Sequence, residues 1–124
     1  MKHARPSWAW LFFLQLTVVA TASVLAARGQ FPAGLFQRWG LDKIGHLLAY
    51  GGLSLLGVAF FGPARRAWVV GALLVAATLE ELSQRAFPAR TFDLGDLAMN
   101  VTGILAFGAL AARRGRPPEP ARET

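Results

Sequence analysis

The sequence of 124 residues contains no cysteine and few charged residues, which make up only 16% of the chain. The absence of cysteine excludes disulfide bonds, thiolate metal sites and a cysteine nucleophile. A soluble domain usually carries about 25% charged residues, so this chain has few with which to cover a surface that faces water. Hydrophobic residues make up 54% of the chain, and this surplus indicates that much of the surface faces lipid.

The sequence also lacks the motifs of several common enzyme classes. It contains no Gly-rich phosphate loop, no nucleotide-binding fingerprint and no nucleophile elbow. The net charge of +6 comes from Lys and Arg residues that stand in small groups beside apolar runs, not in one stripe. Such groups are typical of membrane topology signals, so we predict that the chain has no nucleic-acid partner.

Four apolar segments stand out, and they cover residues 8–27, 44–61, 67–83 and 94–112. About 20 helical residues, each rising 1.5 Å, cross a hydrocarbon core of about 30 Å. Backbone groups in lipid must be satisfied within the segment, which favours helices. We therefore predict an all-α integral membrane protein, an up-and-down bundle of four transmembrane helices within one domain, residues 1–112. The polar, proline-rich tail, residues 113–124, is predicted to be disordered.

The distribution of Lys and Arg predicts the orientation of the bundle. Eight of these thirteen residues lie near the termini or in the 62–66 turn, and five lie in the connectors 28–43 and 85–93. Because cytoplasmic loops carry the excess of Lys and Arg, we expect both termini in the cytoplasm and the protein in the inner membrane. The connector 28–43 is expected to contain an interfacial half-helix. The first segment is longer than a signal-peptide core, so we expect it to be retained.

Five of the seven acidic residues lie where helices are predicted to begin or end. Asp42 opens the second helix, Glu80 and Glu81 lie near the end of the third, and Asp93 and Asp96 open the fourth. In an up-and-down bundle these three positions share one end. The sequence therefore predicts that the acids converge at one membrane face, the outer one.

Polar side chains continue the same helix faces. Asp42, His46 and Tyr50 are spaced i, i+4, i+8, which places them on one stripe of the second helix. Glu81 and Gln84 on the third helix, and Asp96, Asn100 and Gly103 on the fourth, have comparable spacings. Charged residues inside a span are costly unless they face one another. We therefore predict a polar pocket between these helices.

These motifs, in their order, resemble the VanZ-like family of small bacterial membrane proteins. That family shows a DK-x-x-H-x-x-x-Y helix, an E-x-x-Q helix end, a loop with Arg, and a D-x-x-x-N-x-x-G helix. The matching residues are Asp42, Lys43, His46, Tyr50, Glu81, Gln84, Arg90, Asp96, Asn100 and Gly103. The resemblance covers residues 42–108 and implies a role in the cell envelope; the founding member is associated with teicoplanin resistance. Glu80 is an acid that departs from the pattern, and we expect it to extend to the interface, away from Glu81.

The candidate catalytic residues are His46, Glu81 and Asp96. His46 would relay protons, because its charge changes near neutral pH, or it would only hydrogen-bond a neighbouring helix. Glu81 and Asp96 would form an acid/base pair, since close carboxylates separate their pKa values. The alternative for these two carboxylates is salt bridges to Arg90 and Lys43.

The candidate binding residues are Asp42, Lys43, Tyr50, Gln84, Arg90 and Asn100. Arg90 would hold a phosphate or carboxylate through two hydrogen bonds, or it would cap its loop. Gln84 and Asn100 are expected to hydrogen-bond neighbouring helices. The cluster contains one histidine, and its possible metal ligands have no regular spacing. We therefore predict no metal site and no cofactor.

The sequence leaves three main functions open. The first is a binding protein whose outward-facing pocket holds an anionic lipid or a lipid-linked cell-wall intermediate. The second is a membrane-embedded enzyme that performs acid/base chemistry on such a lipid. In the third, the polar residues only specify how the helices pack. A proton-coupled transporter is a fourth and weaker hypothesis, because the sequence has no inverted repeat.

Overall fold

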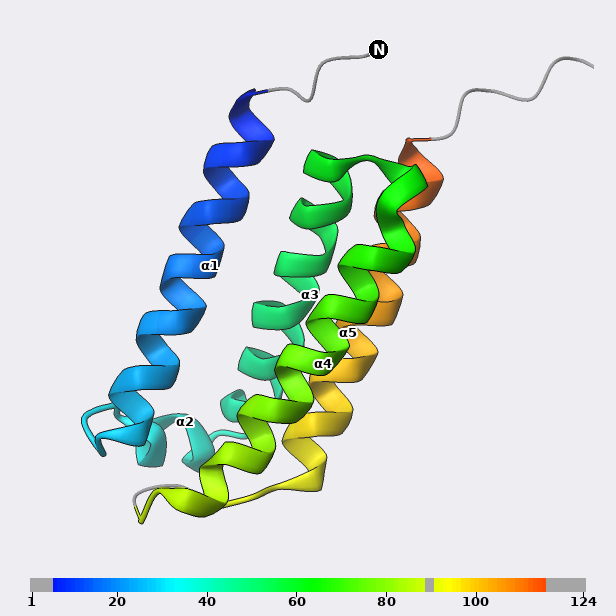
Figure 1. Cartoon of the computed structure of the whole chain (residues 1–124). Coiled ribbons are helices and arrows are strands. Elements are labelled where there is room, and N and C mark those ends of the chain that lie inside the picture. Colours follow the sequence, from blue (N-terminus) through cyan, green and yellow to red (C-terminus); the bar gives the residue numbers. More distant parts are fainter. Residues whose placement is uncertain (1–5, 89–90, 116–124) are drawn as a thin grey trace, which may run out of the picture.

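A computed structural model of the chain describes residues 6–88 and 91–115, and the regular structure within these ranges is entirely helical (Figure 1). The long helices are α1 (Pro6–Ala27), α3 (Leu41–Phe61), α4 (Arg66–Ser83) and α5 (Leu94–Arg114). The short elements are α2 (Ala33–Arg38) and the 3₁₀ turns η1 (Pro63–Arg65) and η2 (Gln84–Ala86). The all-helical prediction is thus confirmed for the described residues, and Arg113 and Arg114 belong to α5. Residues 116–124 of the predicted tail lie outside the described residues.

Four stretches of the described chain are long and apolar enough to cross a membrane. They are Ser7–Ala27, Leu41–Phe61, Pro63–Ala86 and Leu94–Arg114. The exposed side chains of α1 include those of Leu11, Phe13, Leu14 and Val18. A helix that carries apolar side chains around its circumference suits a lipid environment better than water. The chain is therefore a candidate multi-pass membrane protein.

Glycine, proline and aspartate set the ends of the helices. Gly40, directly before α3, has φ +66°, and Gly62, directly after it, has φ +96°; only glycine adopts such values without a Cβ clash. Pro63 then opens η1. At the start of α5, the Asp93 side chain accepts a hydrogen bond from the Gly95 backbone N–H at 2.7 Å, which satisfies one of the unpaired donors of the first turn.

The long helices run alternately up and down (Figure 1). The beginning of α1 and the end of α5 lie at one end of the bundle. The short α2, the start of α3, the end of α4 and the start of α5 lie together at the opposite end. The predicted topology is confirmed for the described residues, and so is the placement of the five acidic residues at a common end.

The most extensive helix contact joins α3 to α5. Gly103 of α5 faces the backbone of α3 at Leu47 and Gly51, and Ser54 donates a hydrogen bond to the carbonyl oxygen of Ile104 at 2.7 Å. Small residues at such crossings let two helix backbones approach closely. By contrast, α1 packs mainly along α3, to which Gln15 donates a hydrogen bond at the Ala49 carbonyl oxygen, 3.2 Å away.

The Gly103→Ala substitution should loosen the contact between α3 and α5. The new Cβ would collide with the carbonyl oxygen of Leu47 and lie 3.2 Å from the Gly51 Cα. We expect a loss of about 1–3 kcal/mol in the free energy of unfolding, measured in detergent. Gly71→Ala is the control, because its Cβ would meet nothing within 4 Å; it should be neutral or stabilising by up to about 1 kcal/mol. Equal stability of the two variants would contradict the close packing.

Candidate functional site

A cavity of about 590 Å³ lies at the end of the bundle where α2 is found. Residues of α1, α2, the start of α3, the end of α4 and the segment leading into α5 line it. Its polar lining side chains include Ser23, Asp42, His46, Tyr50, Glu80, Gln84, Asp93 and Asp96. Ligand pockets in proteins usually measure about 300–1,000 Å³, so this cavity has room for a small molecule or a headgroup.

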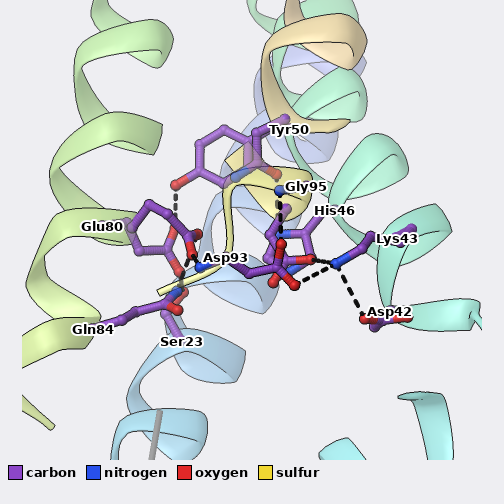
Figure 2. A network of polar contacts seen from close by, with 12 residues as sticks. Ser23, Asp42, Lys43, His46, Tyr50, Glu80, Gln84, Asp93 and Gly95 are labelled. Atoms are coloured by element: carbon purple, nitrogen blue, oxygen red, sulfur yellow. Dashed lines mark hydrogen bonds and ion pairs between the residues drawn. The ribbon is translucent and has the colours of Figure 1, made fainter. Parts of the chain in front are cut away.

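Lys43 stands at the centre of an ion cluster with Asp42, Asp93 and Asp96 (Figure 2). Its Nζ lies 2.7 Å from Asp93 Oδ2, 2.5 Å from Asp96 Oδ1 and 3.6 Å from Asp42 Oδ2. The cluster joins the first turn of α3 to the first turn of α5. The contact between Lys43 and Asp96 is the salt bridge that the sequence offered as the alternative role of Asp96.

His46 lies one turn further along α3, between Asn100 and Asp96. Its Nδ1 is 3.1 Å from Asn100 Oδ1, and its Nε2 is 3.4 Å from Asp96 Oδ2. An amide oxygen only accepts hydrogen bonds, so Nδ1 donates to Asn100 and Nε2 faces the carboxylate. With Nδ1–H held in this way, Nε2 is the nitrogen that can exchange a proton with Asp96 or with a molecule in the cavity.

Glu80 lies inside the site, and the prediction that it extends to the interface is wrong. Its two carboxylate oxygens accept hydrogen bonds from the Tyr50 hydroxyl and from Ser23 Oγ, the latter at 2.6 Å (Figure 2). The reason is the position of α1, whose C-terminal part brings Ser23 close to the end of α4. The sequence missed Ser23, whose only signal was that it is a small polar residue in an apolar helix.

Glu81 occupies a different position from the one predicted for a cavity acid. Its side chain is buried, with 1% exposed, and it does not line the cavity. Its Oε1 accepts a hydrogen bond from the Asp93 backbone N–H at 2.9 Å, and its Oε2 accepts one from Gln84 Nε2 at 3.3 Å. Glu81 therefore supports the segment that leads into α5, and its pairing with Asp96 as acid and base stays a prediction.

Gln84 lines the cavity and is 3% exposed. Its side chain extends from η2, directly after α4, toward Ser23 and Asp93 (Figure 2). While Nε2 donates to Glu81, the buried Oε1 has no hydrogen-bond partner among the described residues. A buried acceptor without a partner is costly, and this one lies beside the cavity. Arg90, the predicted anion clamp, lies outside the described residues.

The Lys43 ammonium, which hydrogen-bonds the Asp93 carboxylate, holds the pKa of Asp93 below its ordinary value of 3.8. Desolvation acts in the opposite direction, and the Gly95 backbone N–H adds to the lowering. A group whose pKa is lower in the folded chain stabilises the fold above its unfolded pKa, and this stability is lost as the pH falls through the folded value.

We therefore expect Asp93→Asn to remove an acid-sensitive contribution to stability. Asparagine still caps α5, so the substitution removes the charge but not the cap. Wild type should be more stable than the variant at about pH 6, and the difference should shrink as the pH falls below about 4. Thermal unfolding in detergent across this range measures the difference. A difference that does not change with pH would argue against the ion pair.

Comparison with known proteins does not assign a family or a function to the chain. No protein-family model, no curated protein and no solved structure matches the chain. The resemblance to the VanZ-like family therefore stays a prediction that rests on the order and spacing of the polar motifs.

Proposed function

We propose that this chain is a VanZ-like, multi-pass protein of the bacterial cell envelope that binds the headgroup of a membrane lipid or of a lipid-linked cell-wall intermediate. The observation that carries the proposal is the cavity, which combines polar and apolar walls. Carboxylates and His46 line one part, and apolar side chains such as Val18, Val19 and Phe31 line another. An amphipathic molecule satisfies both kinds of wall, whereas water alone leaves the apolar wall unfavourably hydrated.

The depth of the cavity supports a headgroup as the ligand. The cavity lies where α3 begins and α4 ends, close to the boundary of the apolar spans. Charged side chains cost less at the ends of a span than at its centre, and headgroups occupy this level. Trp39 is 71% exposed in the connector at this end, while Trp10 and Trp68 are 78% and 82% exposed toward the other. Tryptophan is enriched at both membrane interfaces.

The orientation belongs to the same proposal. The surplus of Lys and Arg near the termini and in the 62–66 turn favours a cytoplasmic location for that end of an inner-membrane protein. The cavity would then open outward, where lipid-linked cell-wall intermediates are used. The charge of the headgroup is a separate question, because Lys43 is already paired with Asp93 and Asp96.

A second candidate function is a membrane-embedded acid/base enzyme, which the contacts of His46 favour. Nδ1 is held by Asn100 and Nε2 faces Asp96, so the imidazole is oriented for proton transfer at one nitrogen. If the protein is an enzyme, wild type should carry a product and His46→Gln should carry unconverted substrate, as a difference in the mass of the retained lipid. Identical retained lipids would count against catalysis.

The binding proposal is tested by filling the cavity at Gly45. This residue lines the cavity, and a Cβ built on it meets nothing within 4 Å. Leucine there should occupy ligand space without disturbing the fold, and a helix former in place of glycine is favourable by up to about 1 kcal/mol. We expect Gly45→Leu to lower the amount of retained lipid by about tenfold, which corresponds to about 1.4 kcal/mol. Native mass spectrometry of the purified protein measures this amount.

Gly71→Leu is the matched control, because Gly71 also has open space around it but does not line the cavity. It should retain as much lipid as wild type. Unchanged lipid retention in a folded Gly45→Leu variant would refute the proposal.

A further inference from the structure

The cavity lining carries more negative than positive groups among the described residues. Four carboxylates line it, those of Asp42, Glu80, Asp93 and Asp96. Lys43 is within hydrogen-bond distance of Asp93 and Asp96 and does not itself line the cavity. The side chain of Arg85 is exposed, and its guanidinium lies over the ring of Phe92, 4.4 Å from the ring centroid.

From this lining we infer that the headgroup bound in the cavity carries a primary ammonium group. The inference rests on the proposed function and specifies the chemical class of its ligand. It differs from the anionic headgroup that the sequence predicts, because Lys43 is paired with Asp93 and Asp96 and no lysine or arginine among the described residues lines the cavity. An anion placed here would meet the carboxylates of Glu80 and Asp42 without a free lysine to offset them.

Gln84 provides an observation independent of the acidic cluster. Its Oε1 is buried and has no partner among the described residues, although the side chain lines the cavity. An N–H or O–H donor, from water or from a ligand in the adjoining cavity, would satisfy this acceptor. A phosphate oxygen cannot supply a donor when it is ionised, whereas an ammonium group supplies three donors and no acceptor.

The end of α4 and the start of η2 bring two acceptor side chains to the cavity. Glu80 lies in the last turn of α4 and Gln84 opens η2 directly after it, and both line the cavity. The Glu80 oxygens each accept one hydrogen bond, from Tyr50 and from Ser23, and each retains capacity for a second. In our inference, the ammonium group of the ligand donates hydrogen bonds to the Glu80 carboxylate and to the Gln84 amide.

The rest of a lipid fits the other walls of the cavity. The rings of Phe31 and Phe36 stack with centroids 5.5 Å apart, and both line it together with Val19 and Ala22 of α1. These apolar side chains suit the glycerol and upper acyl region of a lipid. Ser23, which is also in α1, lies next to Glu80. The apolar wall of the cavity is therefore adjacent to the Glu80 carboxylate.

The experiment compares three lipids with identical acyl chains by native mass spectrometry of the purified, delipidated protein. Phosphatidylethanolamine has a primary ammonium group, phosphatidylcholine has the positive charge without N–H donors, and phosphatidylglycerol has a negative charge with hydroxyl groups. We expect phosphatidylethanolamine to bind about tenfold more tightly than either of the others. Comparison with phosphatidylcholine separates recognition of N–H donors from recognition of charge.

Two variants test which side chains produce the preference for phosphatidylethanolamine. Glu80→Gln keeps an acceptor for one of the Tyr50 and Ser23 hydroxyls, presents an N–H donor to the other, and removes the negative charge. It should reduce phosphatidylethanolamine binding by about fivefold or more without weakening phosphatidylglycerol binding. Gln84→Met removes the amide acceptor at unchanged charge and should also reduce the preference for phosphatidylethanolamine. It carries the test if Glu80→Gln does not fold. Thr78→Ala, on the exposed side of α4, is the control and should bind like wild type.

The outcomes separate this inference from the proposed function. Tighter binding of phosphatidylglycerol would contradict the inferred ammonium group but not the proposal that a headgroup binds in the cavity. Equal binding of phosphatidylcholine and phosphatidylethanolamine would show that N–H donors are not recognised, which also overturns the inference. Failure of all three lipids to bind, together with unchanged lipid retention in Gly45→Leu, would refute the proposed function itself.

Discussion

The pairing of Lys43 with Asp93 and Asp96 is the interaction on which the rest of this end of the bundle depends. Charges at the edge of an apolar span are tolerated only when they are paired or hydrated, and here one ammonium serves two carboxylates at 2.7 Å and 2.5 Å. Because the cluster joins the first turns of α3 and α5, it sets their register. His46 consequently meets Asn100 one turn further in.

Close packing of α3 on α5 and the looser position of α1 together produce the cavity. Gly103 lets the two helix backbones approach, so little space is left between them. In contrast, α1 follows α3 and reaches the end of α4 through the hydrogen bond from Ser23 to Glu80. Space remains between these helices, and residues of α2 complete its lining. The cavity is therefore a product of unequal helix packing.

The polar residues serve packing and ligand chemistry at the same time. Lys43 and Asn100 are occupied by partners on a neighbouring helix, as the structural hypothesis expects. Neutralising the lysine in this way leaves the cavity lined by acceptors, among them Glu80 and the amide oxygen of Gln84. The contacts that hold the bundle together thus shape what the cavity can bind, and the two roles are consistent with each other.

The sequence by itself determined the four helices, their alternating direction and the convergence of Asp42, Asp93 and Asp96 at one end. These features follow from local periodicity, the length of apolar runs and chain connectivity, all of which are visible in one dimension. Only the tertiary structure decided that Glu80 lines the cavity while Glu81 is buried behind it. Neighbouring residues on a helix point about 100° apart, and which of two acids faces inward depends on where another helix packs. For the same reason the sequence could not identify Ser23 as the partner of Glu80, since 57 residues separate them and only the placement of α1 brings them together.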